Sequence, residues 1–205
     1  MRRQITFLTV LLAFIALFSL TGCIFSPDDD TGPPPGNEPP EYDFPDTKEI
    51  VLGNLKIAYE EMDINGYRDC LHPDFKFVFT DFDADQFEIP NSYFERSEDL
   101  EVMERTFSGN SHTTEDGTQP GLQDISISDW TNGGVWQQEA ANHIYFPEAY
   151  RALYNIYMVY SEVGGEHTFT IQTTQHFYVE PVEELQDDGT TRPHWYIIGQ
   201  EDLLQ

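Results

Sequence analysis

Apolar residues recur three or four positions apart at the start of the folded region. The members of this stripe are Val51, Leu55, Ala58 and Met62. The spacing predicts an amphipathic helix over 47–63, and Asp46 with Glu49 three residues later resembles a capping arrangement at its start. Gly66 interrupts the pattern, a second short helix is expected to run to Leu71, and His72-Pro73 forces the chain out of the helix.

A period of two follows this helical pair. Phe75, Phe77 and Phe79 alternate with other residue types, which predicts a strand with one apolar face. The three rings invite a cofactor interpretation, but core packing is favoured, because aromatic side chains supply the largest buried areas.

The middle of the chain predicts one more helix and one more strand. Ser92 is expected to cap a helix through Phe107, with its inward side chains at Phe94, Leu100, Met103 and Phe107. A polar loop is expected at 108–121. Ile125 and Ile127 then alternate with polar residues in a strand that ends near Trp130, and Asn132-Gly133 offers a turn. Residues 137–149 are ambiguous.

The last third predicts strands over 151–162, 167–180 and 194–203. Gly164-Gly165 is the strongest hairpin signal in the chain. If these glycines are the two loop positions, the numbers of any two residues that face each other across the hairpin add up to 329. With this register, one face of the hairpin is clearly more apolar than the other. That face carries Tyr154, Ile156, Met158, Tyr160, Phe169, Ile171, Thr173, Gln175 and Phe177.

This order of elements predicts an α+β domain in which N-terminal helices pack against a curved antiparallel sheet. The chain resembles the nuclear transport factor 2-like superfamily, the cone-shaped fold of ketosteroid isomerases and polyketide cyclases. Three stretches carry the resemblance: 54–79, "YFERSEDLEVMERTF" at 93–107 and "HWYIIGQEDLL" at 194–204. It covers roughly 47–204 and consists of fold motifs, without a catalytic signature.

The N-terminus has the layout of a secretory signal at 1–22. Arg2 and Arg3 precede an apolar run from Ile5 to Leu20, which is shorter than the about 20 residues of a membrane-spanning helix. Leu20-Thr21-Gly22-Cys23 resembles the bacterial lipobox, and this resemblance implies a signal peptide cleaved before a lipidated Cys23. Two or more acyl chains anchor a protein stably to a bilayer. In lipoproteins of enteric bacteria, an aspartate directly after the lipidated cysteine implies retention in the inner membrane. Ile24 stands at that position here, so we expect the protein at the outer membrane.

Acidic residues dominate the chain as a whole: 37 Asp and Glu stand against 10 Lys and Arg, for a formal charge of −27. Nucleic acid is therefore excluded as an expected partner. Residues 26–46 contain seven prolines and seven acids but no base, which predicts an extended tether within 23–46, followed by one domain at 47–205. With Cys23 lipidated, Cys70 has no partner for an internal disulfide.

Four residues are candidates for lining a pocket in the domain. The register places Tyr154 opposite Gln175 on the apolar face, where Tyr59 and Trp195 approach from the first helix and the last strand. A structural hydrogen bond between Tyr154 and Gln175 is favoured over a ligand site, because buried polar groups normally find partners. The same register opposes His167 to Glu162 in an exposed ion pair.

Metal and nucleophile motifs are weak. Asp81, Asp83 and Asp85 begin like a calcium-binding loop, but Gln86 and Ser92 replace its glycine and final glutamate; a solvated acidic loop is favoured. The histidines lack zinc-ligand spacing, and Ser108, Ser111 and His112 fall in the polar loop. We expect no cofactor and no metal.

Two classes of function remain open. The leading hypothesis is a lipid-anchored, non-enzymatic envelope protein whose domain serves binding or assembly, with a homodimer through the open sheet, an envelope protein or a small apolar ligand as partner. A purely structural role in the envelope is a further form of it. The alternative is a small isomerase or cyclase that acts on an apolar substrate, with Asp69 or Glu201 as base. A cavity of ~300 Å³ or more that contains a carboxyl of raised pKa would favour the enzyme.

Overall fold

The computed structural model describes residues 40–114, 117–165, 167–186 and 189–203. The chain divides into two units, Met1–Glu41 and Tyr42–Gln205, and the fold below concerns the second. The predicted signal peptide, Cys23 and most of the predicted tether lie outside the described residues. None of the described helices is long and apolar enough to cross a membrane.

Two of the main helices come before the first strand in the sequence, and the third follows the second strand. Helix α2 spans Lys48–Glu60 and α3 spans Ile64–Cys70, which confirms the predicted helical pair. The N-cap of α2 is Thr47, whose hydroxyl oxygen accepts from Ile50 N at 3.3 Å, and not Asp46. Helix α5 spans Arg96–Phe107 and is capped by a reciprocal pair of Glu95 and Glu98, and not by Ser92.

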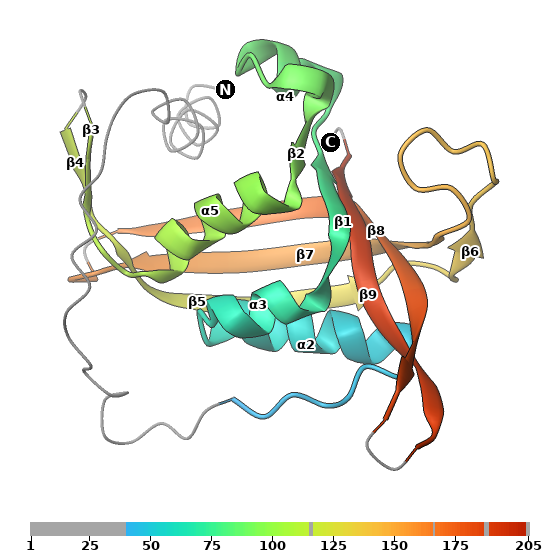
Figure 1. Ribbon diagram of the computed structural model, residues 1–205. Helices are drawn as coiled ribbons and strands as arrows, with labels where there is room; N and C mark the ends of the chain where they lie inside the picture. Colours follow the sequence, from blue (N-terminus) through green and yellow to red (C-terminus); the bar gives the residue numbers. More distant parts are fainter. Residues whose placement is uncertain (1–39, 115–116, 166, 187–188, 204–205) are drawn as a thin grey trace. The chain divides into compact units, whose positions relative to one another are not determined.

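Seven strands form one curved sheet (Figure 1). Along the sheet the main order is β2 (Tyr93–Glu95), β1 (Leu71–Val78), β9 (Thr191–Asp202), β8 (Thr168–Leu185), β7 (Tyr150–Glu162) and β5 (Leu122–Asn132). Strand β6 (Gln137–Gln138) pairs with β7. All pairs are antiparallel except β1 with β9, which run parallel.

The hairpin register was predicted correctly. Tyr154 pairs with Gln175, and the same sum holds from Tyr150–Val179 to Ser161–Thr168. Glu162 also lies opposite His167, since its backbone N donates to His167 O at 3.1 Å. The Glu162 side chain is buried, however, so the expected exposed ion pair is wrong in that respect.

Two expected loops contain regular structure. The acidic segment forms helix α4 (Asp81–Gln86), which Thr80 caps by accepting from Asp83 N at 3.1 Å. Aspartates in the first turn of a helix suit its dipole, which explains why this run folds. The polar loop holds a small hairpin of β3 (His112–Thr114) and β4 (Gly117–Gln119), and a short 3₁₀ turn, η1 (Pro90–Ser92), precedes β2. Phe94, expected inside α5, lies in β2.

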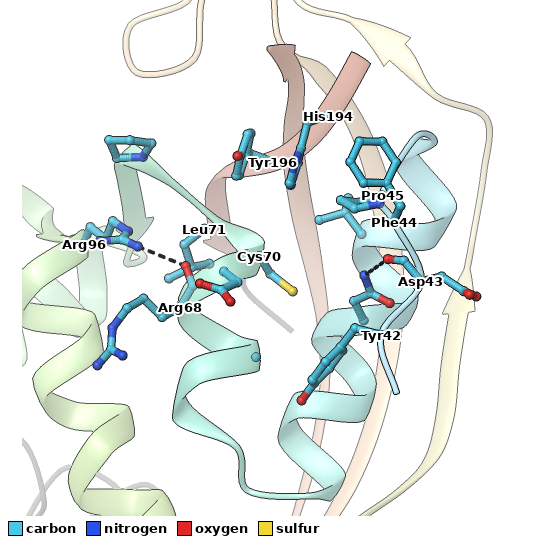
Figure 2. Close-up of a pocket in the computed structure, with 15 residues that line it drawn as sticks. Tyr42, Asp43, Phe44, Pro45, Arg68, Cys70, Leu71, Arg96, His194 and Tyr196 are labelled. Carbon is cyan, nitrogen blue, oxygen red and sulfur yellow. Dashed lines mark hydrogen bonds between the residues drawn. The ribbon is translucent and has the colours of Figure 1, made fainter. Parts of the chain in front are cut away.

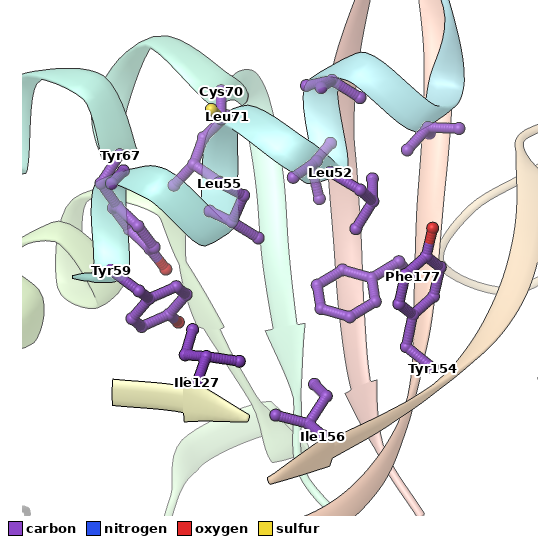
Figure 3. Close-up of a cluster of buried hydrophobic side chains, with 14 of the residues drawn as sticks. Leu52, Leu55, Tyr59, Tyr67, Cys70, Leu71, Ile127, Tyr154, Ile156 and Phe177 are labelled. Atoms are coloured by element: carbon purple, nitrogen blue, oxygen red, sulfur yellow. The ribbon is translucent and has the colours of Figure 1, made fainter. Parts of the chain in front are cut away.

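Two apolar clusters hold the domain together. The larger one packs α2, α3 and the end of α5 against β1, β5, β7, β8 and β9 (Figure 3). The smaller one joins Val78, Phe146, Ala149 and Tyr178, so Tyr178 faces away from its neighbour Phe177. Phe146 lies so close to Gly199 that an added Cβ would be 2.2 Å from its ring. The ambiguous 137–149 segment therefore folds over part of the sheet.

Residues 42–45, which we had assigned to the tether, lie against the domain. Tyr42 Oη donates to Asp63 Oδ2 at 3.0 Å, and Asn54 Nδ2 donates to Asp43 O at 2.7 Å. Trp195 N donates to Pro45 O at 2.8 Å. These contacts place the start of the folded unit at Tyr42, before the expected boundary at 47.

Candidate functional site

A carboxyl and two tyrosines meet inside the domain. Asp99 on α5 accepts a hydrogen bond from Tyr67 Oη on α3 at 2.8 Å, and the Tyr67 ring lies edge-on to Tyr59 of α2 at 5.4 Å. All three side chains are buried. Burial raises the pKa of Asp99 to about 7, while the Tyr67 hydrogen bond opposes part of this shift. Burial therefore favours the neutral form of this carboxyl.

A second, half-buried carboxyl is that of Asp202, near the end of β9. Gln175 Nε2 on β8 donates to Asp202 Oδ1 on β9 at 2.5 Å, and Gln200 Nε2 donates to Gln175 Oε1 at 2.7 Å. Burial raises the pKa of Asp202 to about 6, and the Gln175 hydrogen bond lowers it. Burial raises the pKa of Tyr59 well above its ordinary value, and the charges of Asp99 and Asp202 raise it further.

Aromatic rings fill the space around these groups (Figure 3). Phe107 packs against Tyr59 with ring centroids 5.8 Å apart, and Trp130 lies 6.5 Å from the same ring. Trp130 also contacts Phe177 at 5.5 Å and Tyr154 at 5.8 Å. The tyrosines beside Asp99 thus belong to a packed aromatic core.

A surface hollow of about 620 Å³ lies beneath the N-terminal segment (Figure 2). Its walls come from residues 42–45, α2, α3, β1, the start of α5 and β9. His194 stacks on Tyr196 there at 4.1 Å, and Tyr196 Oη donates to Glu184 Oε1 at 2.6 Å. That bond is the main cause that lowers the pKa of Glu184. Neither Asp99 nor Asp202 lines this hollow.

A second hollow, of about 500 Å³, is lined by residues of β5, β7 and β8. Asn155, Tyr157, Gln172 and Thr174 are among its lining residues. Most of the side chains that line it are polar, and neither Asp99 nor Asp202 is among them.

The four predicted pocket residues do not converge on one cavity. Tyr154 and Gln175 are cross-strand partners as expected, but the Gln175 amide bonds to Asp202 and Gln200 on β9. Tyr59 belongs to the Asp99 cluster. Trp195 lies apart from it, against Tyr150 at 5.5 Å and beneath the ammonium of Lys48.

The two carboxylates suggested as a base are also elsewhere. Asp69 is exposed at the surface hollow. Glu201 accepts from Tyr178 Oη at 2.7 Å and lies 3.3 Å from His176 Nδ1. Sequence reasoning missed Asp99 and Asp202, although Asp99 shares its helical stripe with Met103 and Phe107. Within the described ranges, no three His, Cys, Asp or Glu side chains gather closely enough to hold a metal ion.

Comparison with known proteins reveals similar solved structures only. No protein-family profile matches the chain, and no curated protein sequence matches it. The beta subunit of benzoate 1,2-dioxygenase from Burkholderia mallei aligns with 13% identity over 77% of this chain and 87% of its own, at a TM-score of 0.46. A conserved protein from Planctomyces limnophilus aligns with 10% identity over 75% and 89%, at 0.42.

A nuclear transport factor 2-like superfamily protein from Salmonella enterica aligns with 7% identity over 75% of this chain and 84% of its own, at 0.40. The structural neighbours are thus proteins of the nuclear transport factor 2-like and ketosteroid isomerase-like fold. The domain is α+β, with helices against a curved, mainly antiparallel sheet.

Proposed function

We propose that this protein is a lipid-anchored component of a bacterial envelope, held at the outer membrane through Cys23, and that its domain binds a partner without catalysis. The lipobox-like Leu20-Thr21-Gly22-Cys23 and the acidic, proline-rich stretch after it support the anchor and tether. The charge of −27 suits a soluble domain held off an anionic membrane surface.

The observation that carries the non-catalytic assignment is the packing around Asp99. Its carboxyl is hydrogen-bonded to Tyr67 and surrounded by buried rings, whereas the 620 Å³ hollow has other residues on its walls. A general acid or base needs to reach its substrate to within hydrogen-bond distance or through one water. Burial of Asp99 in a filled core favours a structural role for it.

A second candidate function is an isomerase or cyclase, and one observation favours it. Asp99 has a pKa of about 7 beside two tyrosines, and such shifts are typical of acid–base sites. For this function the core would have to open enough to admit an apolar substrate against Asp99.

An apolar probe distinguishes the two functions. We expect the folded protein to leave Nile red fluorescence unchanged, because the interior is occupied. Saturable, one-to-one binding of the dye that Asp99→Asn weakens, and that the exposed control Asp124→Asn leaves unchanged, would favour the enzyme and contradict our proposal.

The anchor is tested separately with labelled palmitate and membrane fractionation. The wild-type chain is expected to take up label and sediment with outer membranes, and Cys23→Ser is expected to do neither. Label retained by Cys23→Ser, or an unlabelled wild-type protein in the soluble fraction, contradicts the anchor without bearing on the domain.

A further inference from the structure

The ammonium group of Lys48 lies against three aromatic rings. Lys48 Nζ is 4.2 Å from the ring centre of Tyr150, 4.7 Å from that of Trp195 and 5.8 Å from that of Trp136. All three distances fall within the about 6 Å over which a cation is attracted to an aromatic face. We call Trp136, Tyr150 and Trp195 the aromatic cage.

The three rings of the cage also have contacts other than those with the lysine. Tyr150 begins β7 and meets Trp195 of β9 edge-on, with ring centres 5.5 Å apart. Trp136 directly precedes β6, and its Nε1 donates to Glu49 Oε1 at 2.7 Å. The backbone of Trp195 is held by Pro45 O. Helix α2 packs against β9 (Figure 1), and Lys48 is its first residue.

The position of Lys48 in its helix is electrostatically unfavourable. Lys48 is the first residue of α2, where the helix dipole repels a positive charge. Lys56 and Arg151 pair with the carboxylates of Glu60 and Glu139, whereas the ion pairs of the described residues include none for Lys48. The rings are therefore the groups that hold this ammonium.

We propose that the aromatic cage is a binding site for an organic ammonium ion, and that Lys48 occupies it until such a ligand displaces the lysine. A methylated ammonium is a better occupant than a primary one, because its charge is less hydrated and its methyl groups pack on the ring faces. The chain's net charge of −27 raises the local concentration of cations and repels anions. The inference rests on the proposed binding function and names its ligand class.

Tetramethylammonium is the probe, and tryptophan fluorescence of the full chain in a non-ionic detergent is the measurement. Lys48→Met vacates the cage but keeps an apolar stem, so it is expected to bind at least about tenfold more tightly than the wild type, which must first displace a tethered competitor. Trp136→Leu in the Lys48→Met background should lose this binding. Neutral tert-butanol should not bind, because the attraction needs a charge.

Lys76→Met is the matched control, since Lys76 Nζ lies over one ring alone, that of Tyr93 at 5.5 Å. It should leave the affinity for tetramethylammonium unchanged. Equal affinities of Lys48→Met and wild type, retained binding in the Trp136→Leu double variant, or equal binding of tert-butanol would each overturn the proposal.

A second measurement keeps a lysine at position 48 and so does not depend on how Lys48→Met folds. Reductive ¹³C-methylation places dimethyl groups on Lys48, whose NMR signal should be shifted upfield by the rings. Titration with tetramethylammonium should return this signal to the position of an exposed lysine. An unshifted signal, or one that does not respond, would overturn the proposal.

Two sources supply this chemistry, a free ammonium and a lipid headgroup. Two probes distinguish them: choline in solution, and vesicles of phosphatidylcholine with phosphatidylglycerol vesicles as the control. Binding of either choline probe supports the site and identifies the source. Binding of neither overturns the proposal. Failure of the cage leaves palmitate labelling and Nile red exclusion unaffected, so it is distinguishable from failure of the proposed function.

Discussion

Tyr67 Oη donates a hydrogen bond of 2.8 Å to Asp99 Oδ2 and thereby joins α3 to α5 inside the domain. Both residues are buried, and burial raises the pKa of the Asp99 carboxyl. A carboxyl so placed stabilises the helix pair as a neutral group and opposes folding when it ionises. This pair therefore links the stability of the domain to pH.

We predict that Asp99→Asn changes the pH dependence of unfolding. The carboxyl titrates near its ordinary value of 3.8 in the unfolded chain and near 7 in the folded domain. Between these values the folded state holds the proton that the unfolded chain has lost, so the free energy of unfolding falls as pH rises. About three pKa units correspond to roughly 4 kcal/mol at most.

Urea unfolding at pH 4 and pH 8 measures this effect. The Asn variant should gain stability relative to the wild type between the two values, by up to a few kcal/mol. General repulsion among the acids also weakens the domain at high pH, so Asp124→Asn, at an exposed position, serves as the control. A constant difference between Asp99→Asn and wild type would mean that Asp99 is ionised throughout.

The hairpin at Gly164-Gly165 yields a prediction about backbone conformation. Both glycines have positive φ, +96° and +68°, and no atom stands within 4 Å of an added Cβ. Gly165→Ala is expected to lower the free energy of unfolding by about 1–2 kcal/mol through backbone strain alone. Gly165→Asn should cost less, because asparagine adopts this conformation more readily.

Gly134→Ala is the matched control for the hairpin variants. Gly134 also has open space around it and lacks a positive φ, so its substitution should change stability by less than about 0.5 kcal/mol. Denaturant titration of the three variants is sufficient. Equal losses for Gly165→Ala and Gly165→Asn would rule out the conformational explanation.

The hairpin and the Asp99 cluster show which features the sequence could predict. The register of β7 and β8 depends on a two-residue turn and a period of two, both of which are local. Asp99 is buried because Tyr67, thirty-two positions earlier, offers a hydrogen bond. No local pattern contains such a partner, and an acidic residue in an acidic chain is ordinarily expected at the surface.

The same reasoning explains why the sequence did not predict the ring contacts of Lys48 or the docking of residues 42–45. The cage joins α2 to residues from β7, β9 and the strand-poor 133–149 region, so no spacing in the sequence brings its rings together. Residues 42–45 have the composition of a tether but bond to Asp63, Asn54 and Trp195. Composition predicts that a segment cannot fold alone, and says little about whether it docks on a folded surface.

Cys70 gives a prediction about chemical reactivity. The thiol is buried, and burial raises its pKa to about 12. Alkylation requires the thiolate, so iodoacetamide at pH 8 should leave Cys70 unmodified in the native protein and modify it fully in urea. Mass spectrometry measures the modification. Rapid labelling under native conditions would show that α3 opens to solvent more often than its packing implies.

Two helical glycines predict opposite effects of the same substitution. Gly53, inside α2, has no atom within 4 Å of an added Cβ, so Gly53→Ala is expected to stabilise the domain by about 0.5–1 kcal/mol. At Gly66, in α3, the added Cβ would lie 2.0 Å from Tyr42 Oη. Gly66→Ala must displace Tyr42 and break its hydrogen bond to Asp63, at a cost of about 1 kcal/mol or more.

A double-mutant cycle isolates the role of Tyr42. With Tyr42→Ala as background, Gly66→Ala no longer meets the ring and should stabilise the domain as Gly53→Ala does. Gly66→Ala alone should also speed proteolytic cleavage within 42–46, because the docking of that segment depends in part on Tyr42. If Gly66→Ala destabilises the domain equally in both backgrounds, its cost arises elsewhere and the close contact between Gly66 and Tyr42 does not hold the segment in place.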